Sequence, residues 1–496
     1  MWSCSSRSGT GARRSVICRV SSRGSGRPRC AGRRSSRSSP LSRNRATASS
    51  PEAWPRSAPG RWRPIDPRCP IPSTWPSGSC RAAQARVRSC NATSEAVRLS
   101  GALDGLVALD LATYVAAPFC CTLLGELGAD VIKVEQPGVG DDLRRLGHQP
   151  SPGISYMWLV EGRNKKSITC NLREPEGQAL IARLAARADI LAENFRPGTM
   201  EKWNLGYDAL SAANPRLVMV RISAFGQTGP SRGRPGFGRI AGAVSGVSYI
   251  SGYPDRPPVS PGTPTIPDYL AGVMGAFGAL AAIESRHGTG LGQVVDVALY
   301  EPMLRMLDEM IPLHAALGKI RERIGSGTEY VVPHDHYRAR DGSWIAIACT
   351  NDRMFERLAV EAMGRPELHA EFSSMDERLR RREDLDARVQ DWVGSFAADE
   401  VLARLDAASV PCSRVNSVQD LFADPQLRAR ENLIPVPGPG GETIWMPGIV
   451  PKLSLTPGRV TSAGPATPGT HNEEIYCGRL GLSREDLAAL ARRGVV

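Results

Sequence analysis

Buried strands and amphipathic helices alternate between residues 105 and 226, and this alternation limits the possible folds more than any other feature of the sequence. Helical patterns occupy 117–128, which begins near Pro118 and ends at Gly128, and 174–188. Strands that are joined through helices run parallel and need cover on both faces of the sheet. The sequence therefore predicts an α/β fold. The expected strands are GLVALDL (105–111), ADVIKVE (129–135), KSITCNL (166–172), DILAENF (189–195) and RLVMVRISAFG (216–226).

The second half of the chain has a different pattern of predicted helices, strands and loops. Residues 269–283 carry no charge and predict a buried helix, and 292–304 predict a strand that passes into another helix. We expect a loop at 318–342, then a strand at 342–350 and charged helices at 352–364 and 382–409. These patterns predict a large α/β domain at 101–334, a smaller α+β domain at 335–440 and a C-terminal return to the large domain at 441–496.

The first hundred residues differ from the rest in composition and charge. They contain 20 arginines, no lysine and three acids, a formal charge of +17, which leaves −5 for residues 101–496. This Arg-, Ser-, Pro- and Gly-rich segment has too few apolar residues to offset the entropy lost on folding. We expect a disordered extension, inert or translated from a misplaced start, with the folded protein beginning near Leu103. A nucleic-acid-binding arm and an organellar presequence are the alternatives.

The six cysteines after residue 100 show no C-x-x-C pair and no regular spacing. We expect reduced thiols, no metal site and a cytoplasmic location, or the mitochondrial matrix if residues 1–100 form a presequence. The longest apolar run is shorter than a membrane span. No aromatic side chains are interleaved with the arginines in the manner of base-stacking proteins. We therefore expect no membrane partner and no nucleic-acid partner.

One acid, Asp268, stands at the entrance of the apolar segment, directly after Pro267. A carboxylate at this place is commonly a helix cap or first-turn residue, which stabilises a helix by about 1 kcal/mol. The helix that follows is apolar all round, which predicts a buried terminus. Gly272, Gly275 and Gly278 would let another backbone approach closely. A poorly solvated carboxylate kept ionised by the helix dipole also suits a nucleophile.

Five further segments occur in a set order: LDGLVALDLATYVAAPFCCTLLGELGADVIKVEQPGVGD (103–141), GRNKKSITCNLREPEG (162–177), ADILAENFRPGTMEKWNLGYDAL (188–210), SAFGQTGP (223–230) and ESRHGTGLGQVVDVALYE (284–301). Together they resemble the family III CoA-transferases, the CaiB/BaiF family to which formyl-CoA transferase belongs. The resemblance begins near Leu103 and includes none of the first hundred residues. Each segment alone is modest evidence, whereas five in register are highly specific.

The resemblance implies a large Rossmann-like CoA-binding domain, a small domain and a homodimer of two interlocked rings. It implies that coenzyme A thioesters are substrates and that no cofactor is bound permanently. Asp268 occupies the place of the family's catalytic aspartate. Such an aspartate attacks an acyl-CoA, forms an acyl anhydride and then an aspartyl-CoA thioester, and passes the CoA to a carboxylic acid. On family grounds, dicarboxylates such as succinate are candidate donors or acceptors.

The resemblance also implies contacts with CoA. Gln136 stands where relatives often have arginine, so its phosphate contact would be uncharged and weaker. Backbone around Val115 and Ala116 would meet the cofactor, although relatives often have a polar residue in place of Val115. The phosphates, ribose, adenine and pantetheine would be met by Arg163, Lys165, Asn194, Phe195, Arg196, Lys202 and Arg234. Several of these follow predicted strands, where α/β proteins bind ligands.

The segment IGSGTEYVVPHDHY (324–337) stands where the family has a mobile glycine-bearing loop. Gly325 and Gly327 would allow this loop to close over the intermediate and exclude water. His334 and His336 make a poor metal site with a single acid between them, so no role is assigned to them.

Two other functions compete with CoA transfer. The α-methylacyl-CoA racemases of the same family use a His/Asp pair, but the corresponding stretch, GFGRIAGAVSG (236–246), has Arg239 and no histidine. An arginine cannot act as a neutral base near pH 7. The alternative of another class is a non-catalytic protein that binds CoA or nucleic acid, in which Asp268 would be only a cap.

Overall fold

The computed structural model describes residues 101–496 except 261 and 264, so the expectation for residues 1–100 lies outside the described residues. A parallel sheet of six strands forms the centre of the large α/β region, in the order β3-β2-β1-β4-β5-β6. This is the doubly wound order of dinucleotide-binding folds, and it confirms the α/β prediction. The strands are β1 (Val107–Asp110), β2 (Asp130–Glu135), β3 (Lys165–Thr169), β4 (Ile190–Glu193), β5 (Val218–Ser223) and β6 (Val294–Ala298).

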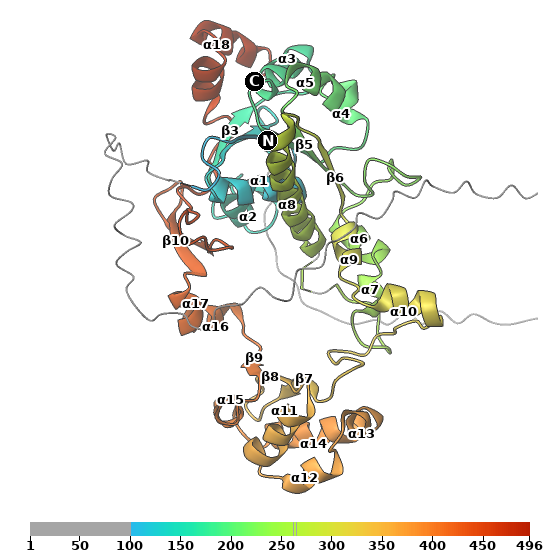
Figure 1. Ribbon diagram of the computed structural model, residues 1–496. Helices are drawn as coiled ribbons and strands as arrows, with labels where there is room; N and C mark the ends of the chain where they lie inside the picture. The colour runs from blue at the N-terminus through green and yellow to red at the C-terminus, as the bar shows by residue number, and fades with distance from the viewer. Residues whose placement is uncertain (1–100, 261, 264) are drawn as a thin grey trace, which may run out of the picture. The chain divides into compact units, whose positions relative to one another are not determined.

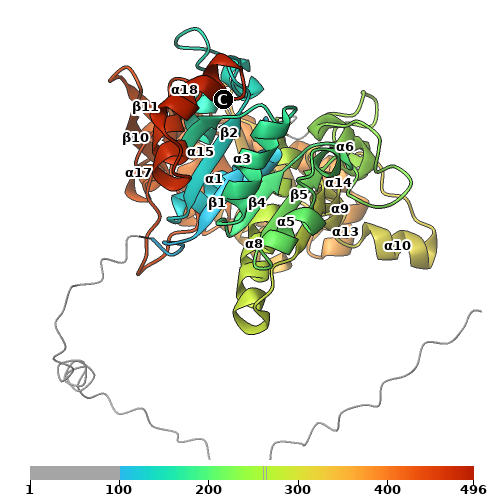
Figure 2. The same ribbon diagram turned by 90° about the horizontal axis from the view of Figure 1, so that it is seen from above.

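Helices cover both faces of this sheet (Figures 1 and 2). Successive strand side chains point to opposite faces, so Ala108 packs with one group of helices and Leu109 with the other. The face with Ala108 is covered by α1 (Ala116–Glu126), α6 (Gly238–Val244) and α8 (Ile266–Thr289). The face with Leu109 is covered by α3 (Pro175–Ala185), α4 (Thr199–Lys202), α5 (Tyr207–Ala213), η3 (Glu473–Arg479) and α18 (Arg484–Arg492).

A second hydrophobic core gathers buried residues from Val332 to Val410. The antiparallel strands β7 (His334–Arg338), β8 (Trp344–Ala348) and β9 (Cys412–Arg414) form its sheet. Its helices are α11 (Asp352–Glu356), η2 (Arg357–Ala362), α12 (Pro366–Glu371), α13 (Met375–Arg380), α14 (Arg382–Gly394) and α15 (Ala398–Ala407). The boundaries proposed at residues 334 and 440 stay predictions.

The remaining elements are a β-hairpin and several short helices. The hairpin strands β10 (Leu433–Pro437) and β11 (Thr443–Pro447) pack against Leu159. The other helices are η1 (Asp142–Arg145), α2 (Tyr156–Glu161), α7 (Val247–Ile250), α9 (Glu301–Arg305), α10 (Met310–Leu317), α16 (Val418–Ala423) and α17 (Pro425–Ala429).

Two expectations for the second half need correction. The stretch expected as a loop at 318–342 contains strand β7, whose side chains are mostly polar, so only pairing with β8 reveals it as a strand. The helix expected at 382–409 is divided into α14 and α15, because the side chain of Asp341 accepts a hydrogen bond from the Ala398 N–H at 3.0 Å and starts a new helix there.

Helix α8 begins two residues before Asp268, which lies in its first turn. Among the described residues, α8 alone has the length and hydropathy to cross a membrane, but it packs against α1, β5 and β6. Its outer side leaves Val273, Met274 and Phe277 exposed, so the helix is only partly buried. Gly272 faces α1 so closely that an added Cβ would lie 2.6 Å from the Ala116 carbonyl oxygen. This confirms the close approach predicted from the glycines.

Candidate active site

A cavity of about 250 Å³ lies where β1, β4 and β5 end. Crevices at the carboxyl ends of parallel strands, next to the point where the strand order reverses, are where doubly wound folds bind ligands. The reversal here is between β1 and β4. Three chain segments and one helix terminus therefore share the lining. The segments are Thr113–Ala116 after β1, Asn194–Pro197 after β4 and, from the end of β5 onward, Ile222–Ala224 with Arg232 and Arg234–Phe237. The helix terminus is that of α8, which contributes Asp268, and Leu299 completes the lining.

Asp268 contributes the one carboxylate in this lining. Burial raises the pKa of its side chain to about 6, and the hydrogen bond from its own backbone N–H only partly opposes that effect. No other side chain is recorded as a hydrogen-bond or ion-pair partner of Asp268 in the described part of the chain. A carboxylate that is desolvated, ionised above pH 6 and unpaired is available to react with a ligand.

The N-termini of two helices meet at the cavity because α8 packs on α1 at Gly272. Helix α1 begins at Ala116, and Val115 and Ala116 are buried in the cavity wall. The first N–H groups of a helix have no partner within the helix and carry partial positive charge. The arrangement therefore places donors on α1 and a carboxylate on α8 around one space.

The loop before α1 is held from two sides. The Asn194 side chain accepts from the Thr113 N–H at 2.9 Å and donates to the Thr113 carbonyl at 2.7 Å. Tyr114 has a left-handed backbone with φ of 64°, and its N–H donates to the Asp141 carboxylate at 3.1 Å. The Tyr114 ring meets Phe237 edge to face at 6.1 Å.

Three exposed arginines, Arg196, Arg232 and Arg234, line the same cavity. Within 101–496, leaving out 261 and 264, no ion pair joins any of the three to an acid. The Arg234 guanidinium lies 5.1 Å from the centre of the Phe225 ring. The cavity is therefore positively charged around Asp268 and suits an anionic ligand.

The structure brings six of the residues predicted to bind CoA to this lining, together with Asp268: Val115, Ala116, Asn194, Phe195, Arg196 and Arg234. Gln136 and Lys202 are exposed and lie outside the lining. Their contacts with CoA stay predictions.

Arg163 and Lys165 are buried and paired with acids, and their contacts with CoA stay predictions. Arg163 is 5% exposed and its guanidinium binds Glu126 at 2.5 Å and the Pro447 carbonyl at 2.8 Å. Lys165 is 3% exposed, and its ammonium binds Asp110 at 2.9 Å and the Pro118 carbonyl at 2.7 Å. Both cations are enclosed with acids from distant parts of the chain, so neither charge faces the cavity.

The loop predicted to close over the site does not line the cavity either. The Gly325 N–H donates to the Gly252 carbonyl at 3.0 Å, and a side chain at Gly325 would overlap the Tyr253 ring. His334 and His336 lie on β7. No group of His, Cys, Asp and Glu side chains that could hold a metal ion occurs among the described residues. Loop closure by Gly325 and Gly327 stays a prediction.

Tyr114, Ser223, Arg232 and Phe237 are among the lining residues that the sequence did not single out. Ser223 is 7% exposed, and its buried hydroxyl has no hydrogen-bond partner among the residues that the structure describes. Buried hydroxyls without partners are rare, and one beside a cavity can serve a ligand. Its place at the end of β5 was a usable signal, because strand ends form the lining of such crevices.

Comparison with known proteins agrees with this arrangement. Residues 103–472 match the model of CoA-transferase family III. The chain is 47% identical over 398 residues to the succinyl-CoA–L-malate CoA-transferase beta subunit of Chloroflexus aurantiacus, covering 79% of this chain and 98% of that protein. It is 44% identical over 396 residues to the succinyl-CoA–D-citramalate CoA-transferase of the same organism, with shares of 79% and 98%.

A solved structure is also similar. The crystal structure of a CAIB/BAIF family protein from Brucella suis shares 33% sequence identity and superposes with a TM-score of 0.69, covering 76% of this chain and 99% of that one. The two small antiparallel sheets and the parallel six-stranded sheet thus belong to a fold already seen in this group. The match over residues 103–472 and the identity to these transferases show that the chain belongs to CoA-transferase family III.

Proposed function

We propose that this CoA-transferase moves CoA from succinyl-CoA to a small dicarboxylic acid, with Asp268 as the nucleophile. The observation that carries the proposal is that Asp268 shares its cavity with arginines that form no ion pair with an acid among the described residues. A dicarboxylate presents one carboxylate for reaction and leaves a second one that needs a cation. The relatives named for L-malate and D-citramalate support the same class of acceptor.

In the first half-reaction, a carboxylate oxygen of Asp268 attacks the thioester carbonyl of succinyl-CoA. The C–S bond breaks, CoA leaves as a thiolate, and a mixed succinyl–aspartyl anhydride remains. The thiolate then attacks the aspartyl carbonyl, which releases succinate and leaves an aspartyl-CoA thioester. Covalent catalysis of this kind divides one difficult exchange into easier steps.

In the second half-reaction, a carboxylate oxygen of the acceptor attacks the aspartyl-CoA thioester and displaces the thiolate. The resulting anhydride is attacked at the acceptor's carbonyl, which gives the new acyl-CoA and restores the Asp268 carboxylate. Each step exchanges one oxygen–carbon bond for one sulfur–carbon bond, so no redox partner is required. The N–H groups at the start of α1 are placed to stabilise the oxyanions.

The arginines divide between the two ligands. Arg196 follows β4 beside Asn194 and Phe195, and with Arg234 it binds the phosphates of CoA. Arg232, the third arginine of the lining, binds the distal carboxylate of the dicarboxylate. Arg239 lies at the start of α6, outside the main cavity, beside Pro267. No histidine of the described residues lines the cavity with Asp268, which favours transfer over racemisation.

The proposal is tested by mass spectrometry and by a panel of acceptors. Protein incubated with succinyl-CoA and hydroxylamine should carry a hydroxamate on Asp268, and borohydride should trap the thioester as an alcohol at the same residue. L-Malate, citramalate and mesaconate should accept CoA far better than butyrate of similar length. No adduct on Asp268, or full transfer by Asp268→Ala, would contradict the proposed mechanism.

Arg232 separates dicarboxylate recognition from CoA binding. We expect Arg232→Ala to raise KM for a dicarboxylate by about ten- to a hundredfold, because a charge-assisted contact contributes about 1.5–3 kcal/mol. KM for succinyl-CoA should rise less, since CoA keeps its own contacts. Arg232→Lys, which retains the charge without the paired N–H groups, should recover part of the loss. An equal rise for butyrate would contradict this role.

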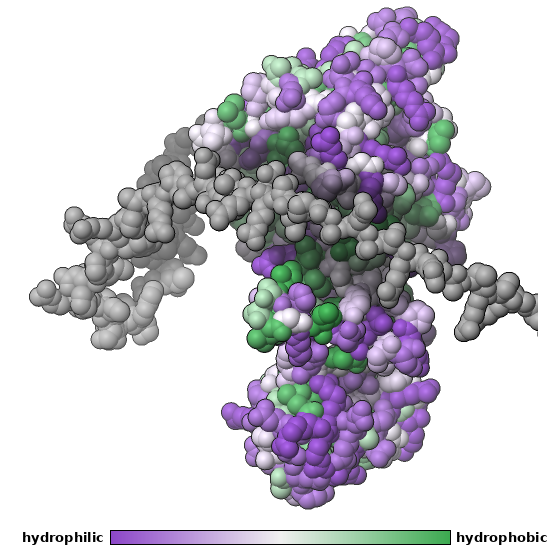
Figure 3. Space-filling view, turned by 90° about the vertical axis from the view of Figure 1, so that its right-hand side faces the viewer, coloured by the Kyte–Doolittle hydropathy of each residue, from purple (hydrophilic) through white to green (hydrophobic). Residues whose placement is uncertain are grey.

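We further propose that two copies of the chain form the homodimer that the family resemblance implies. Helix α10 has no buried residue, and Leu317 is 75% exposed; on α8, Phe277 is 67% exposed. Figure 3 shows hydrophobic residues in the middle of the face toward which α10 projects. Such patches in a soluble protein mark interaction sites. Light scattering after gel filtration should give a dimer mass, and Phe277→Glu with Leu317→Glu should give a monomer. A monomeric parent protein would contradict the proposal.

A further inference from the structure

Six buried charged side chains form a cluster next to the cavity, named here the Lys133 cluster. None is more than 3% exposed, and the three cations balance the three acids. Four of its members come from one short segment that begins within β2, KVEQPGVGDDLR (133–144). The members are Asp110, Lys133, Glu135, Asp141, Arg144 and Lys165.

One side of the cluster bonds directly to the loop that lines the cavity. The Lys133 ammonium donates to the carbonyl of Ala112 and lies 2.8 Å from the Asp141 carboxylate and 3.4 Å from Asp110. The other Asp141 oxygen accepts from the Tyr114 N–H at 3.1 Å and from the Leu143 N–H at 2.9 Å. Lys133 therefore holds the Ala112 carbonyl, and Asp141 holds the Tyr114 N–H, two residues further along the same loop.

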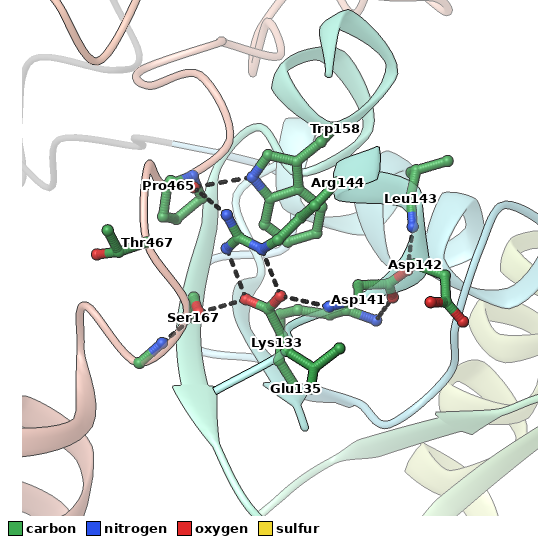
Figure 4. Close-up of polar contacts among 12 residues, drawn as sticks. Lys133, Glu135, Asp141, Asp142, Leu143, Arg144, Trp158, Ser167, Pro465 and Thr467 are labelled. Carbon is green, nitrogen blue, oxygen red and sulfur yellow. Dashed lines mark hydrogen bonds and ion pairs between the residues drawn. The ribbon is translucent and has the colours of Figure 1, made fainter. Parts of the chain in front are cut away.

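The opposite side anchors the cluster to the C-terminal segment (Figure 4). The Arg144 guanidinium binds Glu135 at 2.6 and 2.8 Å and donates to the carbonyls of Pro465 and Ala466 at 3.0 and 2.9 Å. The central carbon of the Arg144 guanidinium lies 3.9 Å from the centre of the Trp158 ring. Glu135 in turn accepts from the Asp141 N–H at 2.8 Å, so the anchor and the loop contact are joined.

The loop conformation that the cluster holds is one that tyrosine does not favour. Tyr114 has φ of 64°, in the left-handed region, which is unfavourable for a residue with a large side chain. Such a conformation persists only where surrounding contacts determine it, and such residues gather at functional sites. Here the contacts are Asp141 on the Tyr114 N–H and Asn194 on both backbone groups of Thr113.

A buried ion cluster is weak evidence for added stability, because the desolvation of its charges offsets most of their attraction. It does fix a geometry, since each charge must keep its partners. We propose that Lys133 and Asp141 are positioning residues for CoA transfer, which hold Ala112–Ala116 so that Tyr114, Val115 and the start of α1 face Asp268. This role rests on the proposed function for its effect on catalysis, but the loop geometry can be tested without it.

Asp141→Asn tests the role with little change of shape. The asparagine amide has one oxygen, which accepts, and one NH2 group, which only donates. It therefore cannot present one oxygen to the Tyr114 N–H and another to the Lys133 ammonium, as the carboxylate does. Glu126→Gln is the matched control: Glu126 is a buried carboxylate paired with the buried Arg163, and it makes no contact with Ala112–Ala116. Hydrogen exchange followed by mass spectrometry should show residues 111–117 exchanging at least about tenfold faster in Asp141→Asn. Glu126→Gln should leave that peptide unchanged. Unchanged exchange in Asp141→Asn, or an equal increase in Glu126→Gln, overturns the proposal.

A second pair of variants tests the conformation itself. Asparagine adopts a left-handed backbone more readily than tyrosine, so adding Tyr114→Asn to Asp141→Asn should recover part of the protection of 111–117 and tighten CoA binding by about threefold relative to Asp141→Asn alone. The same addition in the parent protein should give no such gain. Equal effects in both backgrounds would contradict the proposed positioning role of Asp141. If the parent protein transferred no CoA, the proposed function would fail while the exchange result still decided this inference.

Discussion

The Lys133 cluster and the cavity beside it both contain several charged side chains, but these are paired in the cluster and unpaired in the cavity. In the cluster every charge is buried and has a partner of opposite sign within 3.4 Å. In the cavity, Asp268 and the three arginines line one space without ion pairs to one another or to the other described residues. Paired charges fix the backbone, and unpaired charges are left for a ligand. The difference separates the residues that build the site from those that act in it.

The largest expected effect comes from removing the unpaired carboxylate. Asp268→Ala should lower kcat by roughly 10⁴-fold or more, as the loss of a nucleophile does in other covalent enzymes. Asp268→Asn should be equally inactive yet more stable at pH 7.5. The pKa of Asp268 rises from 3.8 to about 6 on folding, so the folded state gains relative stability below pH 4 and loses it as the pH rises through 6.

The stability gain in Asp268→Asn should be on the order of 1–3 kcal/mol at pH 7.5, measured by urea unfolding. The same comparison at pH 4 should show a smaller difference, because the parent carboxyl is then protonated. A loss of stability at pH 7.5 would mean that Asp268 has a partner in solution, and the contrast with the cluster would fail at this residue.

The next effect should be on stability. Lys133→Met leaves Asp110 and Asp141 buried without their shared cation, which should lower the free energy of unfolding by about 3–5 kcal/mol. Arg232→Ala removes an exposed, unpaired charge and should change it by less than about 0.5 kcal/mol. Urea unfolding of both variants measures the contrast. Similar losses in the two would remove the distinction between paired and unpaired charges.

The pH dependence of the first half-reaction should follow Asp268. Since the carboxylate is the attacking form, the rate of adduct formation from succinyl-CoA should fall about tenfold per pH unit below an inflection near 6. The free carboxyl of the succinyl group titrates lower, near the ordinary value of about 4.3. A single-turnover experiment without acceptor separates the two. An inflection only near 4 would contradict the raised pKa.

The smallest expected effect concerns Ser223, whose buried hydroxyl has no hydrogen-bond partner in the described part of the chain and is expected to bond to a bound ligand. Ser223→Ala should lower kcat/KM by about three- to tenfold without loss of stability. Ser245→Ala is the matched control, because the Ser245 hydroxyl is buried but already donates to the Gly242 carbonyl at 2.9 Å. That control should lose stability and keep kcat/KM. The reverse pattern would place Ser223 outside the reaction.

Local patterns were enough for much of the fold. The alternation of strands and helices from 105 to 226 gave all five strands in that stretch within a few residues, because apolar periodicity reports which face each element buries. Asp268 was found at a helix terminus for the same reason. Strand β7 was missed because its side chains are mostly polar and its pairing with β8 is not a local property.

By itself, the sequence determined the α/β class from local periodicity. It determined the family resemblance and the candidate nucleophile from short segments that occur in a set order. Only the tertiary structure decided which charges are free. Lys165 and Arg163 look like ligand-binding cations in GRNKKS, but their partners Asp110 and Glu126 lie 55 and 37 residues away. Arg232 looks like any loop arginine until the fold brings it to Asp268. A charge acts on a ligand only if folding leaves it unpaired, and pairing depends on contacts between distant segments.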